Sequence, residues 1–416
     1  MIRAIASVAA LLLGTAILLA GQGLQGVLLP VRATLEDFSA LSVGLMGGTY
    51  FLGFTLGCWL GVAMIRRAGH VRVFAAMTAV ASAAPLIHGL WVNLATWTVL
   101  RGLTGFCFAV LYVVIESWLN ERATNENRGI VFSAYILVNM TLLAAGQQML
   151  LLDDPLELDL FMMVSILVSV AAVPVLLSIQ ATPRDVDRSR IDFAALFRNS
   201  PVGVVGTLAA GLNNGVFWSL AAVFITAYAS NTDSAAWFMT ATIIGGVIGQ
   251  WPLGLWSDRV DRRWVLALIC MLGIVVSLLT WWLTPQLSIE AIMALGFAWG
   301  ALAFPTYSIS VAHANDWADP GTFVEVSAGL LLLYGVGAII GPLLAPIFMA
   351  LLGASGMFAF NAIIFAGLLA YTLVRIRRRP AADEAHHRDF NEAITAARTM
   401  SVVYEAQLDA EEEGRG

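Results

Sequence analysis

The first half of the chain contains the stretch Gly53-x3-Gly57-x-Trp59-x7-Arg67, and the second half contains Gly245-x3-Gly249-x-Trp251-x7-Arg259. All four positions recur after the same interval (245 − 53 = 192). This offset also pairs Gln22-Gly23 with Asn214-Gly215, and Gly129 with Gly321. One match means little in a chain with 37 glycines, but several matches at one offset indicate a duplicated unit.

The composition indicates that the duplicated unit is embedded in a membrane. The chain is 59% apolar and only 12% charged, unlike a soluble domain. Apolar runs of about 20 residues, the length that crosses a bilayer, recur along it. The sequence therefore predicts an all-α polytopic membrane protein with twelve transmembrane helices in two pseudo-symmetric six-helix bundles. The expected spans are Ala4–Leu29, Leu41–Ile65, Val71–Leu90, Leu94–Trp118, Ile130–Leu151, Leu160–Ile179, Val202–Tyr228, Ala235–Trp256, Trp264–Leu283, Ile289–Ala312, Val326–Leu351 and Met357–Val374.

Four segments are expected: a first bundle (1–180), a cytoplasmic linker (181–200), a second bundle (201–378) and an acidic cytoplasmic tail (379–416). Ser200-Pro201 has the residues of a helix cap and first turn. The linker stretch 191–198 has helical apolar spacing and is either a helix on the membrane surface or an ordinary connecting helix.

All 22 basic residues are arginines, and their distribution predicts the orientation. If both termini are cytoplasmic, Arg32 alone lies outside and Arg101 lies within a span, while the others face the cytoplasm as the positive-inside rule requires. The external loops are then acidic, as at Asp153-Asp154. The first span could instead be read as a signal peptide, but its removal would break the count of six spans per half.

No catalytic or metal-binding constellation stands out. Cys58, Cys107 and Cys270 fall on different spans and are expected to be packing residues. The five histidines are scattered or lie in the tail, and nothing matches a phosphate-binding loop or a nucleophile elbow. We therefore expect no enzyme activity, no cofactor, no metal and no nucleic-acid partner.

The loop after the eighth span reads Gly254-x3-Asp258-Arg259-x2-Arg262-Arg263 and resembles the signature loop of the major facilitator superfamily. The resemblance implies that the Asp258-Arg259 step is a charge-paired latch; the alternative is a set of positive-inside anchors. The first copy, Arg66-Arg67-x-Gly69-x2-Arg72, has an arginine at the acidic position. Glu116 is the candidate carboxylate to pair with Arg67 there.

The fourth span carries Arg101-Gly102-x2-Gly105, which resembles the fourth-helix motif of the superfamily, with Thr104 in place of the usual glutamine. One helical face carries Arg101, Gly105, Phe108, Tyr112 and Glu116. An arginine inside a span is costly unless it faces a partner or water, so Arg101 is either a pathway residue or an anchor that extends to the interface. For Glu116, a latch and a proton site remain open.

Uncharged polar residues in the middle of spans are further pathway candidates: Gln22, Gln25, Tyr135, Asn139, Asn213, Asn214 and Gln250. Such side chains also join helices by hydrogen bonds. For the symmetric pair Gln22 and Asn214 we favour the pathway. Gly337-x3-Gly341-Pro342 in the eleventh span is a helix-packing motif. In the superfamily that the signature loop resembles, many proton-linked drug antiporters have a Gly-Pro in the fifth helix. The fifth span here has no proline after Gly146, so the resemblance does not imply that class.

Further stretches are similar to the YcaD-type group of bacterial major facilitator proteins: Leu28-Leu-Pro-Val-Arg32, Val114-Ile-Glu116-Ser-Trp-Leu-Asn120, Asn127-Arg128-Gly129 and Gly249-Gln-Trp-Pro-x-Gly254. The similarity runs from about Gly14 to Arg378. It implies two six-helix bundles that rock about a central cavity in the bacterial inner membrane.

The expected function is a monomeric secondary transporter that moves a small organic solute across the lipid bilayer by alternating access, with protons as the coupling ion. An uncoupled uniporter or exporter of the same fold is one alternative. A sensor that signals through the acidic tail is another. The solute and its direction are not specified by the sequence.

Overall fold

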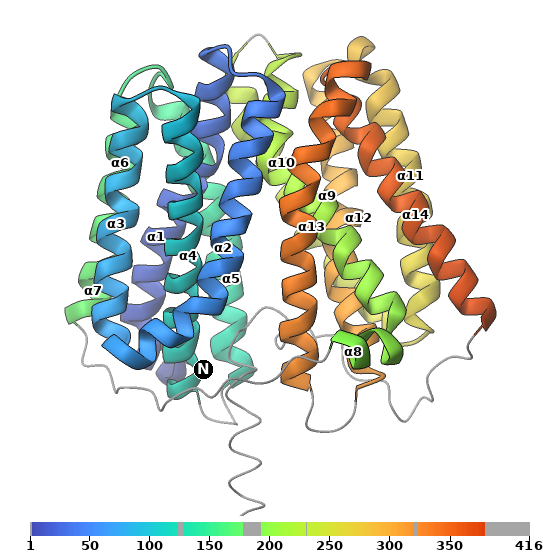
Figure 1. The fold of residues 1–416 in the computed structure, drawn as a ribbon, viewed down its shortest axis with the longest axis horizontal. Helices are drawn as coiled ribbons and strands as arrows, with labels where there is room; N and C mark the ends of the chain where they lie inside the picture. The colour runs from blue at the N-terminus through green and yellow to red at the C-terminus, as the bar shows by residue number, and fades with distance from the viewer. Residues whose placement is uncertain (1, 124–127, 178–192, 230, 319–322, 379–416) are drawn as a thin grey trace, which may run out of the picture. The chain divides into compact units, whose positions relative to one another are not determined.

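The computed structural model describes residues 2–123, 128–177, 193–229, 231–318 and 323–378, which are almost entirely α-helical (Figure 1). These residues include twelve helical segments long and apolar enough to cross a membrane, as predicted. The chain divides into two compact units, Met1–Val186 with Ala229–Thr240 and Asp187–Tyr228 with Ala241–Gly416. The acidic tail and most of the predicted linker lie outside the described residues.

The first unit holds one copy of the six-span repeat. Its elements are α1 (Ile2–Leu35), α2 (Ala40–Ala68), α3 (His70–Leu90), α4 (Leu94–Arg122), α5 (Arg128–Gln148), the 3-10 turn η1 (Met149–Leu152), α6 (Asp159–Val170) and α7 (Ala172–Leu177). Within it, α1 packs against α5 and α6, and α3 packs against α4 and α6.

The second unit uses the equivalent helix pairs, because α9 packs against α13 and α14, and α11 packs against α12 and α14. Helix α10 begins among residues grouped with the first unit and continues into the second. The elements are α8 (Phe193–Asn199), α9 (Pro201–Thr226), α10 (Asp233–Ser257), α11 (Arg262–Leu283), the 3-10 turn η2 (Thr284–Gln286), α12 (Ile289–Asn315), α13 (Phe323–Leu352) and α14 (Gly356–Arg378).

Two predicted helix boundaries can be checked in detail. The Ser200 hydroxyl accepts a hydrogen bond from the Gly203 amide and Pro201 is the first residue of α9, so the predicted cap is confirmed. The sixth span was predicted as one helix but is divided into α6 and α7 at Ala171. Pro174 explains the break, because a proline ring clashes with the carbonyl four residues earlier and offers no N–H to it.

The predicted linker helix is present as α8, with one apolar side chain turned inward. Leu196 is buried against Val311, Ala314 and Leu330 of the same unit, whereas Phe193 and Phe197 are about half exposed. This one-sided burial fits a short helix that lies along the rest of its unit.

Glycines place α2 directly against α4, and α10 directly against α12. A methyl group at Gly105 would overlap the carbonyl oxygen of Tyr50, and one at Gly300 would overlap that of Thr242. The two contacts are equivalent in the repeat. Tyr50 and Thr242 are 192 residues apart (242 − 50 = 192), whereas Gly105 and Gly300 are 195 apart (300 − 105 = 195). The duplication is thus visible as one repeated backbone contact.

The α1–α5 pair and the α9–α13 pair repeat in the same way. A methyl group at Gly146 would overlap the carbonyl of Ala20, and one at Gly341 would overlap that of Leu212 (212 − 20 = 192; 341 − 146 = 195). Gly337 also lies against the α9 backbone, so both glycines of the predicted packing motif are located where α13 contacts α9. Pro342 lies inside α13, which continues to Leu352.

A single offset of 192 residues therefore does not relate all helices of the first half to those of the second. Helices α3 and α11 begin 192 residues apart (262 − 70), whereas α4 and α12 begin 195 apart (289 − 94). The three extra residues fall between α11 and α12, where η2 lies. Gly129 and Gly321, which the sequence paired at 192, fall where the offset is 195, and Gly321 lies outside the described residues.

These contacts predict different effects for two glycines one turn apart on α1. Gly23→Ala forces a methyl group onto the carbonyl of Leu143, whereas nothing lies within 4 Å of a methyl group at Gly26. Overpacking typically costs about 1–3 kcal/mol, so Gly23→Ala should lower the unfolding temperature while Gly26→Ala leaves it unchanged. Because all three cysteines are buried, a thiol-reactive dye can follow unfolding in detergent. Equal effects of the two substitutions would contradict the packing described here.

Candidate functional site

Helices α1, α2 and α4 bring four of their polar side chains together in the middle of the first unit: Gln22, Tyr50, Arg101 and Tyr112, here called the Gln22 network. The Tyr112 hydroxyl donates a hydrogen bond of 2.7 Å to Gln22 Oε1, and Gln22 Nε2 donates one of 3.1 Å to the Tyr50 hydroxyl. All four side chains are half-buried. Polar groups partly exposed in a membrane span require water or a polar solute nearby.

Arg101 completes this network through its guanidinium, which lies over the Tyr50 ring with 4.2 Å between Cζ and the ring centroid. Tyr50 is ten residues into α2, about 15 Å along the helix, and Arg101 is seven residues into α4, about 10 Å. Since α2 and α4 begin at the same end of the unit, the guanidinium points away from the nearer interface. This orientation favours the pathway interpretation over the anchor.

Glu116 lies fifteen residues beyond Arg101 on α4, or about 22 Å along the helix. Its side chain is buried, and its Oε1 accepts a hydrogen bond of 3.1 Å from the hydroxyl of Tyr135 on α5. Asn139 donates to the backbone carbonyl of Tyr135 one turn away. Arg67 is exposed in the last turn of α2, so the pairing of Glu116 with Arg67 stays a prediction.

The other predicted amides lie in varied surroundings. Gln25, Asn213 and Asn214 are buried, and each has one polar atom without a hydrogen-bond partner among the described residues. Asn214 occupies the position of Gln22 in the second copy, as the duplication predicts. Gln250 is half-buried on α10.

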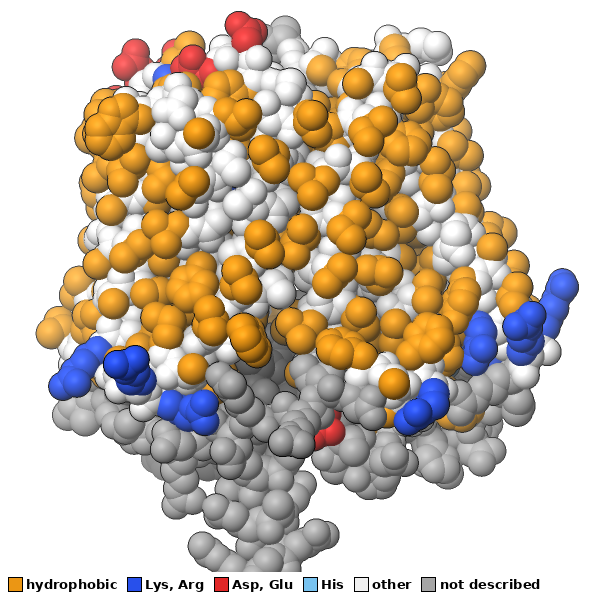
Figure 2. Space-filling view, viewed as in Figure 1, with side chains coloured by type: hydrophobic (Ala, Val, Ile, Leu, Met, Phe, Trp, Pro, Cys, Tyr) orange, Lys and Arg blue, Asp and Glu red, His pale blue; other side chains and the backbone are white. Residues whose placement is uncertain are grey.

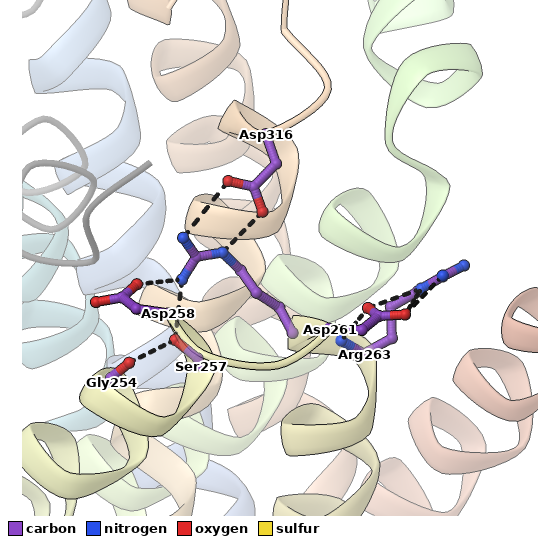
Figure 3. Close-up of polar contacts among 7 residues, drawn as sticks. Gly254, Ser257, Asp258, Asp261, Arg263 and Asp316 are labelled. Carbon is purple, nitrogen blue, oxygen red and sulfur yellow. Dashed lines mark hydrogen bonds and ion pairs between the residues drawn. The ribbon is translucent and has the colours of Figure 1, made fainter. Parts of the chain in front are cut away.

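A second group of charges lies where α10, α11 and α12 of the second unit meet (Figure 3). The Arg262 cluster consists of Ser257, Asp258, Arg262 and Asp316. Arg262 Nε lies 2.7 Å from Asp316 Oδ2, and Arg262 Nη1 lies 2.9 Å from both Asp258 Oδ1 and the Ser257 hydroxyl. The side chains of Arg262 and Asp316 are each only 1% exposed. This ion pair therefore joins α11 to α12 in the interior of the unit.

The structure corrects the predicted latch at one position. Asp258 belongs to the cluster, but its partner is Arg262 four residues later, while the adjacent Arg259 is exposed. A helical spacing of four brings side chains together, whereas neighbouring residues point in different directions. Gly254 contributes its carbonyl, which accepts a hydrogen bond from Ser257.

Arg263 pairs with Asp261, which caps the first turn of α11 (Figure 3). Burial tends to raise the pKa of Asp261, but hydrogen bonds from the Arg263 side chain and backbone, with the charges of Arg263 and His313, outweigh it and hold the pKa below its ordinary value of 3.8. The ionised cap therefore stabilises the fold above that pH, and the contribution is lost as the pH falls further.

The first copy of this loop is built differently. Gly69 alone links α2 to α3, with a positive φ of 84° that favours glycine. The counterpart of Arg262 is His70, whose Nε2 lies 3.0 Å from the Ser117 hydroxyl. Arg67 and Arg72 are exposed.

Sequence reasoning missed Asp316, Ser257 and Tyr50. Asp316 follows an apolar span without any motif around it, and its partner Arg262 is 54 residues earlier. Gly105 could have pointed to Tyr50. A glycine inside a membrane helix marks a place where another helix can come close, and Gly105 lies one turn from Arg101 and contacts the backbone of Tyr50.

Comparison with known proteins agrees with this architecture. The family model of the Major Facilitator Superfamily matches residues 203–406. An uncharacterised MFS-type transporter of Yersinia enterocolitica is 25% identical over 358 residues, which cover 85% of this chain and 90% of that one. The uncharacterised MFS-type transporter YcaD of Escherichia coli is 26% identical over 334 residues, covering 80% and 86%. The crystal structure of the nucleoside transporter NupG has a similar fold, with a TM-score of 0.75, 12% identity, and coverage of 89% of this chain and 99% of that one.

In the described residues, twelve helices long enough to cross a membrane, together with relatives that are MFS-type transporters, support a multi-pass membrane transporter. Residues 203–406 match the Major Facilitator Superfamily, and the predicted similarity of the chain to the YcaD-type proteins is confirmed.

Proposed function

We propose that this protein is a secondary active transporter that moves a small organic solute across the bacterial inner membrane by alternating access, coupled to protons. The Gln22 network carries the proposal, because it gathers hydrogen-bonding groups and one permanent charge in the middle of membrane spans. Such an arrangement costs stability in a structure without a polar pathway, so its presence there supports a role in transport.

The three groups of polar residues suggest three roles. The Gln22 network binds the solute. Glu116, buried beside Tyr135, takes up and releases the proton, since it is a titratable side chain in a span. The Arg262 cluster acts as a latch, because a buried ion pair between helix ends can hold one packing arrangement and release another.

We further propose that both termini are cytoplasmic. In the first unit, arginine side chains gather at one end and acidic side chains at the other (Figure 2). Arg66, Arg67 and Arg72 are exposed at the α2–α3 turn, and Asp153 and Asp154 are exposed in the loop before α6. The positive-inside rule then places the α2–α3 turn in the cytoplasm.

Transport can be tested in vesicles that contain the purified full-length chain. A mixture of metabolites is offered outside or inside the vesicles under a pH gradient, and mass spectrometry follows what moves. We expect at least one solute to cross faster than in empty vesicles and to accumulate only while the gradient lasts. Gln22→Leu should reduce this flux strongly, because it removes both hydrogen bonds to the tyrosines.

A chain that ends at Arg378 is the control for the sensor alternative, and it should transport as well as the full chain. Vesicles that move no solute beyond the empty ones would refute the proposal. In cells, an impermeant reagent should reach a cysteine placed at the exposed Ser39 from outside, in a background without native cysteines. Protection of that cysteine would reverse the orientation.

A further inference from the structure

The Gln22 network leaves several hydrogen-bond donors unused, and most of them belong to Arg101. Among the described residues, no hydrogen bond or ion pair engages its five N–H groups; its contact is the Tyr50 ring. The Tyr50 hydroxyl accepts a hydrogen bond from Gln22, which leaves its own O–H to donate. A group of unused donors that includes a fixed positive charge matches a ligand that supplies acceptors and a negative charge.

Arg101 cannot easily satisfy these donors elsewhere. Its guanidinium is held against Tyr50 by the close approach of α2 and α4, where Gly53 meets the carbonyl of Gly102 and Gly105 meets that of Tyr50. The side chain is half-buried and directed away from the nearer interface. A charge in this position requires water or a counter-ion from outside the described residues, and a solute that carries the counter-ion would meet both needs.

Arg101 contributes one positive charge for a ligand to balance. In the described part of the first unit, the other arginines with placed side chains lie at helix ends: Arg32, Arg66, Arg67, Arg72 and Arg122. One guanidinium in a low-dielectric region is neutralised by one negative charge, and its planar fork matches the two oxygens of a carboxylate. A phosphate ester with two charges would leave one of them unbalanced.

The surroundings of Arg101 also indicate the rest of the ligand. Phe54 lies between Tyr50 and Tyr112, with ring centroids 6.3 Å and 6.1 Å away. The rings are tilted by 34° and 58° to one another, and they form a continuous aromatic surface that begins at Tyr50, next to the guanidinium. A solute that pairs with Arg101 would place its hydrocarbon part against them.

We propose that the transported solute is a small organic monocarboxylate, whose carboxylate binds Arg101 and the Tyr50 hydroxyl and whose apolar or aromatic part contacts Tyr50, Phe54 and Tyr112. This assignment rests on the proposed transport function. It concerns the first unit alone.

Equilibrium binding to the purified full-length protein tests the assignment without any transport. The probes are benzoate, its neutral analogue benzamide, and phenyl phosphate, measured by saturation-transfer NMR in detergent. We expect benzoate to bind at least tenfold more tightly than benzamide, with phenyl phosphate weaker than benzoate. Arg101→Gln should weaken benzoate about tenfold or more, and Arg101→Lys should weaken it less, because it keeps the charge and loses the fork.

Arg66→Gln is the matched control, since it removes an exposed arginine at a helix end and should leave benzoate binding unchanged. Each remaining outcome overturns the assignment: no benzoate binding to the wild type, equal binding of benzamide, preference for phenyl phosphate, or full binding by Arg101→Gln. Even if the Arg101 variants do not fold, the binding of benzoate, benzamide and phenyl phosphate to the wild type tests the assignment. Transport of neutral solutes only would refute this inference and leave the proposed function standing. Benzoate binding without any flux would leave a carboxylate-binding site at Arg101 but refute the proposed transport, and with it the identification of the transported solute.

Discussion

Arg262→Met is expected to destabilise the second half by about 3–5 kcal/mol, whereas Arg259→Met should have almost no effect. Removing Arg262 breaks its ion pair with the carboxylate of Asp316, which is only 1% exposed, and breaking a buried ion pair from one side typically costs about this much. Arg259 is an exposed arginine in the same loop and provides the matched control.

Cys270 offers a local readout for this comparison, because it is buried on α11, the helix that Arg262 begins. With the other two cysteines replaced, the temperature at which Cys270 reacts with a thiol dye reports unfolding of this half. A difference of 3 kcal/mol is more than a hundredfold in the equilibrium constant, so the two variants should separate clearly. Similar unfolding temperatures would show that the ion pair contributes little.

The double variant Arg262→Met/Asp316→Leu separates stability from function. Replacing both members of a buried ion pair by apolar residues is often neutral or stabilising, so the double variant should be more stable than either single one. If the pair is a latch, the stable double variant should still be impaired in transport, since an apolar contact does not exchange partners as charges do. Full transport by the double variant would make the pair a packing element only.

The duplication in the sequence allowed much of the fold to be predicted. Glycines at a fixed interval mark the places where helix backbones touch, and a touching backbone tolerates no side chain, so the repeat survives there when apolar neighbours have changed. Gly105 and Gly300 are such a pair, although the three-residue insertion before α12 hides them from a search at one offset.

The polar contacts were harder to predict, for a physical reason. Hydrogen bonds and ion pairs in these spans join residues on different helices, as in Tyr112 with Gln22, which are 90 positions apart. Sequence spacing locates a side chain on its own helix but not the rotation of the neighbouring helix. The loop after α10 illustrates both sides, because Asp258 and Arg262 were identified in it, while Asp316, the partner of Arg262, emerged only from the packing of α11 on α12.

Glu116→Gln is expected to uncouple transport from the proton gradient while leaving downhill movement of the solute. If one proton accompanies each solute, a pH difference of one unit supports about a tenfold solute gradient, or about 1.4 kcal/mol. Glutamine keeps the size of the side chain and can accept the hydrogen bond of Tyr135, but it cannot exchange a proton. The variant should therefore bring the solute only to equal concentrations on both sides of a vesicle membrane.

Glu121→Gln is the matched control, because Glu121 lies one turn and a residue further along α4 and is exposed. It should accumulate the solute as the wild type does. Tyr135→Phe tests the contact itself, since loss of one hydrogen bond to the carboxylate should reduce the coupled flux partially rather than abolish it. Tenfold accumulation by Glu116→Gln would exclude Glu116 as the proton site and leave it as a residue that joins α4 to α5. Loss of downhill movement in that variant, at normal protein abundance, would place Glu116 in the helix movements of the cycle instead of in proton exchange.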